Sequence, residues 1–211
     1  MTAAGVSLLN YGVGNLGSVR NMFKRLGVAT EDISSPEELR SASRVLLPGV
    51  GTFDHGMNAL ERNGWVDAIR QHANSGKPLL GICLGMQLLL EASEEGQQPG
   101  LGLIPGRALR FDGDNALRVP HMGWNYAEPR ADHPLFGRLD EEARFYFVHS
   151  YFPVPAEEYV IATTTYGRPF CSVHGREGLW ATQFHPEKSG RPGLKILKNF
   201  ADYCREASRA Q

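Results

Sequence analysis

The chain has 211 residues, of which 42% are hydrophobic and 21% are charged. A chain of this length and composition can bury a full core, so we expect one compact domain spanning residues 1–211. The formal net charge is −1, and the basic residues form no run of the kind that binds nucleic acid or an anionic membrane surface. We therefore expect no nucleic-acid partner.

The apolar segments argue against export and against membrane insertion. Residues 1–14 have no basic region ahead of their apolar residues, although a secretory signal would have one. No segment approaches the roughly 20 consecutive apolar residues that a spanning helix needs. We expect a cytoplasmic protein with no membrane partner.

The first half of the chain alternates apolar runs of strand length with segments of helical period. Strands are predicted at residues 6–10, 44–49 and 77–83, and helices at residues 15–27, 54–75 and 84–93. Strands that are apolar throughout and separated by helices are typical of a parallel sheet covered on both faces.

The second half is mostly strand and turn. Glycine and proline become frequent after Gly96, and short β-like runs follow at residues 144–152, 159–166, 170–175 and 179–185, with a last helix at 193–207. No internal repeat divides the chain. The predicted fold class is therefore α/β, with a mostly parallel central sheet flanked by helices and additional antiparallel strands in the C-terminal half.

A cysteine stands between two glycines in GICLGMQ, residues 81–87, directly after a predicted strand and directly before a predicted helix. A turn of the form G-x-C-x-G presents its central side chain on a sharp, strained bend, and Gly81 and Gly85 leave room for the backbone. The helix start beside it favours thiolate over thiol. Cys83 is the candidate nucleophile, and the alternative is a small buried core residue.

The other two cysteines have no such setting. Cys171 lies in a predicted strand and Cys204 on the apolar face of the last helix, so both are expected in the core. The three cysteines contain no CxxC pair, and the histidines lack the spacing of metal ligands. We therefore predict neither a disulfide framework nor a metal site.

A histidine and a glutamate follow the last predicted strand in QFHPEKSG, residues 183–190. In extended chain His185 and Glu187 point to the same side, and Pro186 between them discourages a helix. A carboxylate that holds one ring nitrogen leaves the other free to exchange a proton with a thiol. Taken alone, the pair is also compatible with a solvated loop.

A buried strand ends in a Pro-Gly-x-Gly turn in LLPGVGTF, residues 46–53. Such a turn can cradle a phosphate or can be a simple tight turn, and the helix after it lacks the Lys-Ser/Thr of a Walker loop. In a parallel sheet this turn and the cysteine turn lie side by side, and each can give one N–H to an oxyanion. This arrangement indicates acyl transfer through a thioester.

The motifs LLPGVGTF, GICLGMQ and FHPEKSG together resemble the class I glutamine amidotransferases, from the first predicted strand to the last helix. NYGVGNLGSV (10–19) and PHMGWN (120–125) resemble one branch, the glutaminase subunits of imidazole glycerol phosphate synthases. The resemblance implies a flavodoxin-like fold, no cofactor, and hydrolysis of L-glutamine to glutamate and ammonia. It also implies a heterodimer in which a (β/α)8-barrel cyclase subunit receives the ammonia for histidine biosynthesis.

The same resemblance implies a role for each matching residue. Cys83 is the nucleophile, His185 the general acid and base, and Glu187 its orienting carboxylate. The oxyanion donors are the Leu84 N–H and the peptide between Val50 and Gly51. Polar contacts to glutamine come from Gln87, His149, Ser150 and Tyr151, and the partner surface includes Asn15, His121, Met122, Trp124, Asn125 and Lys188.

Two residues depart from the pattern, because Asn10 stands where relatives often have Asp and Phe152 where a second tyrosine is common. Three alternatives also stay open. One is a glutaminase subunit that serves anthranilate, aminodeoxychorismate or pyridoxal phosphate synthesis. The others are a DJ-1-like or protease-like cysteine hydrolase with the same turn, and a binding module that keeps the fold without catalysis.

Overall fold

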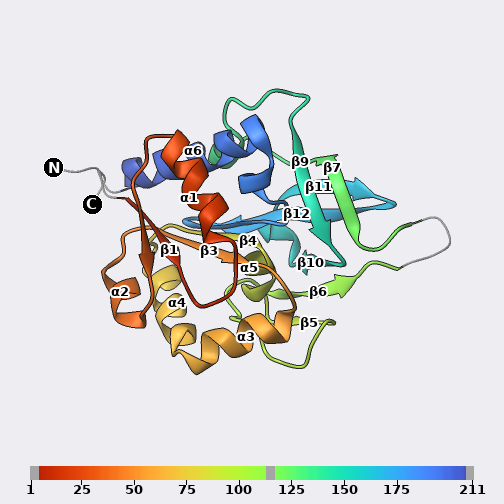
Figure 1. Ribbon diagram of the computed structural model, residues 1–211. Coiled ribbons are helices and arrows are strands. Elements are labelled where there is room, and N and C mark those ends of the chain that lie inside the picture. Colours follow the sequence, from red (N-terminus) through yellow and green to blue (C-terminus); the bar gives the residue numbers. More distant parts are fainter. Residues whose placement is uncertain (1–4, 113–116, 208–211) are drawn as a thin grey trace.

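An eight-stranded sheet runs through the middle of the computed structural model, which describes residues 5–112 and 117–207 (Figure 1). Its parallel part consists, in spatial order, of β2 (Thr30–Ile33), β1 (Val6–Leu9), β3 (Val45–Gly49), β4 (Leu79–Cys83) and β13 (Leu179–Thr182). It continues with antiparallel strands β12 (Arg168–Arg176), β11 (Val160–Tyr166) and β8 (Glu128–Pro129). The predicted fold class is confirmed.

Helices cover both faces of this sheet (Figure 1). One face carries α1 (Leu16–Arg25) and α6 (Gly190–Ala207), and the other carries α2 (Pro36–Ser41), α3 (Phe53–Arg62), α4 (Trp65–Asn74) and α5 (Leu84–Leu88). Side chains of each strand alternate between the two faces. Leu46 and Leu80 pack with Phe23 of α1, whereas Leu47 and Leu79 pack on the other side. The parallel strands are apolar throughout because both of their faces are buried.

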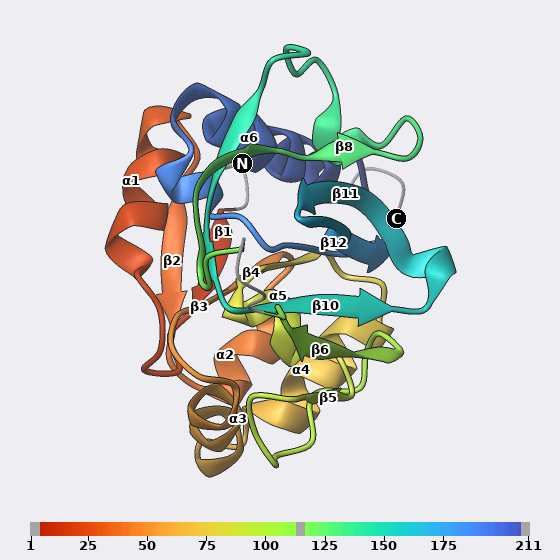
Figure 2. The same cartoon turned by 90° about the vertical axis from the view of Figure 1, so that its right-hand side faces the viewer.

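Two smaller sheets lie at the antiparallel end of the molecule (Figure 1 and Figure 2). One contains β10 (Tyr151–Pro155), β6 (Gly106–Arg110) and β5 (Ala92–Ser93), and the other is a ribbon of β7 (His121–Tyr126) and β9 (Arg144–His149). Short 3-10 helices complete the fold at η1 (Pro134–Phe136), η2 (Glu157–Tyr159) and η3 (Pro186–Lys188). The chain passes from one small sheet to the other at Ser150, which separates β9 from β10.

Three predicted elements are wrong in extent. The single helix expected at 54–75 is two helices, because Gly64 adopts a left-handed conformation with φ +70°. The helix expected at 84–93 ends at Leu88, since the carbonyls of residues 88–90 accept hydrogen bonds from the N–H groups of 101–104 instead. The run at 144–152 is two strands in different sheets. The last two of these breaks depend on contacts between distant segments.

The prediction that Cys171 lies in the core is confirmed. Cys171 is buried, its Sγ donates to the Val173 carbonyl at 3.3 Å, and burial raises the pKa of its thiol. Phe152 is buried within an aromatic cluster, whereas Asn10 is exposed. The side chain of Cys204 lies outside the described residues. In the described ranges, 5–112 and 117–207, no helix has the length and apolarity to cross a membrane.

A single added methyl group tests how closely the beginning of α5, directly after the cysteine turn, approaches β3. A Cβ at Gly85 would lie 2.1 Å from the Leu47 carbonyl oxygen, whereas one at Gly17 in α1 would meet nothing closer than 3.7 Å. We expect Gly85→Ala to lower the free energy of unfolding in urea by about 1–3 kcal/mol, and the control Gly17→Ala to leave it unchanged or raise it by up to about 1 kcal/mol. Equal values for the two variants would contradict this close approach.

Candidate active site

The site lies where the carboxyl ends of three parallel strands meet. β4 lies between β3 and β13, and Gly49 at the end of β3 is directly opposite Cys83 at the end of β4. The turn after β3 carries Val50 and Gly51, and the chain after β13 continues to His185. In open α/β sheets, ligands bind beyond the carboxyl ends of the strands. The three motifs identified in the sequence therefore meet at one edge of the sheet.

Cys83 has a strained backbone at the beginning of α5. Its φ of 54° and ψ of −107° are rare for a residue with a side chain. The turn is held against β3 so tightly that a Cβ on Gly49 would lie 2.8 Å from the Gly85 nitrogen. The backbone N–H groups at a helix start, here beginning with Leu84, have no partner within the helix. Leu84 is thus placed to donate beside the sulfur.

The loop before α1 supports the turn after β3. Tyr11 is buried, and its hydroxyl donates to the Pro48 carbonyl at 2.9 Å. Burial, with a smaller contribution from the charge of Cys83, raises the pKa of Tyr11, so this hydroxyl stays a donor. Gly51 has a φ of +100°, which favours glycine, and nothing lies within 4 Å of the position of its missing Cβ.

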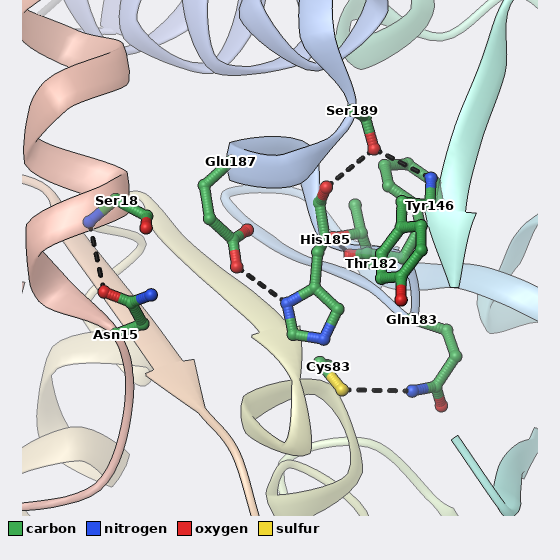
Figure 3. Close-up of polar contacts among 10 residues, drawn as sticks. Asn15, Ser18, Cys83, Tyr146, Thr182, Gln183, His185, Glu187 and Ser189 are labelled. Carbon is green, nitrogen blue, oxygen red and sulfur yellow. Dashed lines mark hydrogen bonds and ion pairs between the residues drawn. The ribbon is translucent and has the colours of Figure 1, made fainter. Parts of the chain in front are cut away.

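Figure 3 shows the His185 ring between Glu187 and Cys83. Its Nδ1 lies 2.7 Å from Glu187 Oε1, and the two side chains are 2% and 4% exposed. Burial alone would lower the pKa of His185, but hydrogen bonds and charge interactions with Cys83 and Glu187 outweigh it and raise this pKa to about 10. This shift of the pKa favours the imidazolium form of His185, with a carboxylate on one side of the ring and the sulfur on the other.

The sequence predicted an extended chain from His185 to Glu187, but only part of this segment is extended. His185 is extended, but Pro186 begins the 3-10 helix η3, which includes Glu187. Ser189 holds this turn, because its hydroxyl donates to the His185 carbonyl at 2.6 Å and accepts from the Tyr146 N–H at 2.9 Å (Figure 3). The His185 N–H donates to the Tyr146 carbonyl at 2.9 Å. β9 therefore fixes the position of the imidazole.

A cavity of about 300 Å³ opens beside the sulfur. It brings together ten of the residues selected from the sequence, with Glu95 and Val148 in addition, while Glu187 lies behind His185. The lining residues are Val50, Gly51, Cys83, Leu84, Gln87, Glu95, Val148, His149, Ser150, Tyr151, His185 and Lys188.

Two polar residues of the site, Gln183 and Glu95, were not selected in the sequence analysis. Gln183 is buried, and its Nε2 lies 3.7 Å from Cys83 Sγ while its Oε1 accepts from Gln87 Nε2 at 3.0 Å. Glu95 Oε2 accepts from the Phe53 N–H at 2.8 Å, and burial raises the pKa of this carboxyl. Gln183 stood within the quoted motif QFHPEKSG, and its position two residues before His185 was the one available clue.

The residues predicted to face a partner divide into two groups along β7. Met122 and Trp124 are 62% and 55% exposed. His121 corrects the prediction, because its side chain is 2% exposed and points into the molecule, as alternation along a strand requires. Asn125 shares that inward face, where it contacts His121.

The remaining predicted surface residues lie near the turn that carries His185 and at the beginning of α1. Asn15 caps α1 by accepting from the Ser18 N–H at 3.2 Å. Lys188 is exposed at the cavity, with its Nζ 5.9 Å from the centre of the Tyr146 ring. Across residues 5–112 and 117–207, no three His, Cys, Asp or Glu side chains are grouped to hold a metal ion.

Comparison with known proteins shows which family has this sequence and fold. The model of the glutamine amidotransferase class-I family matches residues 7–203. The imidazole glycerol phosphate synthase subunit HisH of Maridesulfovibrio salexigens is 48% identical over 211 residues, which are 97% of this chain and 100% of that protein. The subunit HisH of Nitratidesulfovibrio vulgaris, strain Hildenborough, is 49% identical over 212 residues, which are 98% of this chain and 100% of that protein. The solved structure of PurLQS from Thermotoga maritima has a TM-score of 0.74 and 18% identity, covers 96% of this chain and 99% of its own, and shows the shared fold.

Proposed function

Because the chain belongs to the class I glutamine amidotransferase family and, within it, to the HisH subunits of imidazole glycerol phosphate synthase, we propose how its residues hydrolyse L-glutamine. The chain is the glutaminase subunit of that synthase and serves histidine biosynthesis. The observation that carries the proposed mechanism is the position of His185 between Glu187 and Cys83 at the cavity.

In the first half of the proposed reaction, the Cys83 thiolate attacks the side-chain amide carbon of glutamine and forms a C–S bond. The tetrahedral intermediate collapses as its C–N bond breaks, and the His185 imidazolium gives its proton to the leaving nitrogen, which departs as ammonia. A γ-glutamyl thioester remains on Cys83. Glu187 holds the ring orientation and stabilises the cationic state of the imidazole.

In the second half, neutral His185 takes a proton from water, and the oxygen attacks the thioester carbon. The C–S bond breaks, glutamate leaves, and the thiolate and imidazolium are restored. The charge that develops on the substrate oxygen in both halves is stabilised by the Leu84 N–H and by the peptide between Val50 and Gly51. The strained backbone of Cys83 and the close approach of Gly49 support this placement.

Charged and polar groups of the cavity fit the amino-acid part of glutamine. Glu95 is placed against the α-ammonium group, and the segment of Ser150 and Tyr151 forms the opposite contacts. Gln87 acts by holding that segment, because its Nε2 donates to the Tyr151 carbonyl at 3.0 Å. The carboxylate of Glu95 is oriented by its hydrogen bond from the Phe53 N–H.

The chain works with another subunit of the synthase, and we place a (β/α)8-barrel cyclase in that role, forming a heterodimer that receives the ammonia. Support comes from the exposed apolar side chains of Met122 and Trp124 on β7 and from Lys188 near the cavity. The whole chain is proposed to be one glutamine amidotransferase domain, since strands from both halves share the central sheet. The expected cytoplasmic location stays a prediction.

Replacing the sulfur separates glutamine hydrolysis from the synthase reaction. We expect Cys83→Ser to abolish imidazole glycerol phosphate formation from glutamine, because no thioester can form, while formation from added ammonium salt continues. The assay measures both activities in the complex of this chain with its cyclase subunit. Loss of both activities in a complex that still assembles would show instead that Cys83 is structural.

Removing the charge of Glu95 tests the proposed ammonium contact. We expect Glu95→Gln to raise the KM for glutamine by about tenfold or more, since a neutral amide oxygen binds an ammonium group more weakly than a carboxylate does. Glu94→Gln is the matched control, because Glu94 is exposed, does not line the cavity and accepts from the Arg110 N–H. Equal KM values for the two variants would exclude Glu95 from substrate binding.

A further inference from the structure

Two buried histidines lie in contact between the ribbon β7–β9 and the cavity. His121 and His149 are 2% and 6% exposed, and His121 Nδ1 is 3.0 Å from His149 Nε2. The His121 ring stacks on Tyr166 and Phe147, with ring centres 4.0 and 4.8 Å away. His149 lines the cavity, yet the proposed reaction uses neither imidazole.

The hydrogen-bond partners of these rings determine which nitrogens carry protons. The Tyr151 carbonyl can only accept, so His149 Nδ1, 2.8 Å away, must donate to it. Burial lowers the pKa of His149 to about 3, with nearby histidines as smaller causes, so this ring is neutral and its Nε2 must accept. His121 Nδ1 is therefore the donor in the contact between the two rings.

The same reasoning extends to Asn125. Burial lowers the pKa of His121 to about 4, so this ring is also neutral and its Nε2 accepts from Asn125 Nδ2 at 3.3 Å. The amide of Asn125 is oriented by two backbone contacts, because Nδ2 donates to the Thr165 carbonyl at 2.9 Å and Oδ1 accepts from the Tyr126 N–H at 2.8 Å. Every proton in this series of bonds thus has one assigned position.

The other end of the series reaches the catalytic sulfur. The Tyr151 carbonyl also accepts from Gln87 Nε2 at 3.0 Å, and Gln87 donates to Gln183, whose Nε2 lies 3.7 Å from Cys83 Sγ. Tyr151 begins β10, one residue after the bend at Ser150, and both residues line the cavity. The Tyr151 carbonyl is therefore a junction between the two histidines and the nucleophile.

We propose that Asn125, His121 and His149 form a hydrogen-bonded relay of fixed direction that positions the Ser150–Tyr151 wall of the cavity for glutamine binding. His121 and His149 act through the Tyr151 carbonyl and are positioning residues. The relay lies on the inward face of β7, which carries His121 and Asn125, while Met122 and Trp124 on the same strand face outward. The inference rests on the proposed glutaminase reaction.

Three substitutions separate this role from a general loss of stability. His121→Phe keeps an aromatic ring against Tyr166 and Phe147 but removes the donor to His149. His121→Asn places an amide nitrogen close to the position of the imidazole Nδ1 and keeps a donor. His72→Phe is the matched control, because His72 is also buried and contacts a backbone carbonyl, that of Pro78, at the opposite end of β4.

We expect His121→Phe to raise the KM for glutamine by about tenfold and to change kcat by less than about threefold, because substrate positioning is affected more than the reacting groups. His121→Asn is expected to bring KM back to within about threefold of the unmodified chain, and His72→Phe to leave it unchanged. The assay uses the complex with the cyclase subunit. The relay is overturned if His121→Phe matches His72→Phe in KM, or if His121→Asn binds glutamine as poorly as His121→Phe.

A measurement on the unmodified chain keeps the inference testable if His121→Phe does not fold. Nitrogen NMR of the histidine rings, assigned by difference against His121→Asn and His149→Asn, is expected to show both rings neutral and protonated on Nδ1 at pH 7. A ring that is protonated on Nε2, or charged, would contradict the relay. An unmodified complex that does not hydrolyse glutamine would contradict the proposed function instead, whatever the ring tautomers are.

Discussion

The close approach of the beginning of α5 to the carboxyl end of β3 is the constraint on which the site depends. Gly49 and Gly85 have no side chains, so the turn that carries Cys83 lies directly against β3. The resulting backbone is strained at Cys83 and places the sulfur, the start of α5 and the turn at Gly51 around one cavity. Burial of the parallel strands on both faces stabilises the fold and offsets the free-energy cost of this strain.

Buried polar groups on the other side of the sulfur are positioned by backbone atoms of distant strands. β9 holds the turn of His185 through the Tyr146 backbone and Ser189. β10 contributes the Tyr151 carbonyl, which accepts from both His149 and Gln87. A buried donor or acceptor without a partner is costly, so such bonds specify one arrangement of the side chains. The C-terminal half of the chain, which carries little helix before α6, thereby completes a site that begins on the parallel strands.

The sequence allowed three of the five parallel strands (β1, β3 and β4), the cysteine turn and the grouping of Cys83 with His185 to be predicted, because each is marked by local pattern or by glycine spacing. It did not mark β2 as a strand or β13 as a parallel one. It did not allow Glu95 and Gln183 to be placed at the site, since their roles depend on contacts with residues far away in the chain. The prediction that His121 faces a partner was also wrong. The alternation of side chains along a strand would have placed His121 on the face opposite to Met122 and Trp124. The early end of α5 depends likewise on tertiary structure.

The central claim is that His185 is an imidazolium held between the Glu187 carboxylate and the Cys83 sulfur. The most direct test is nitrogen NMR of the His185 ring as a function of pH, assigned by difference against His185→Asn. The account predicts that both ring nitrogens carry protons at pH 8, that the charge is lost only as pH rises through about 10, and that Cys83→Ala lowers this pKa. A neutral ring at pH 8 in the unmodified chain, or a pKa that Cys83→Ala leaves unchanged, would contradict it.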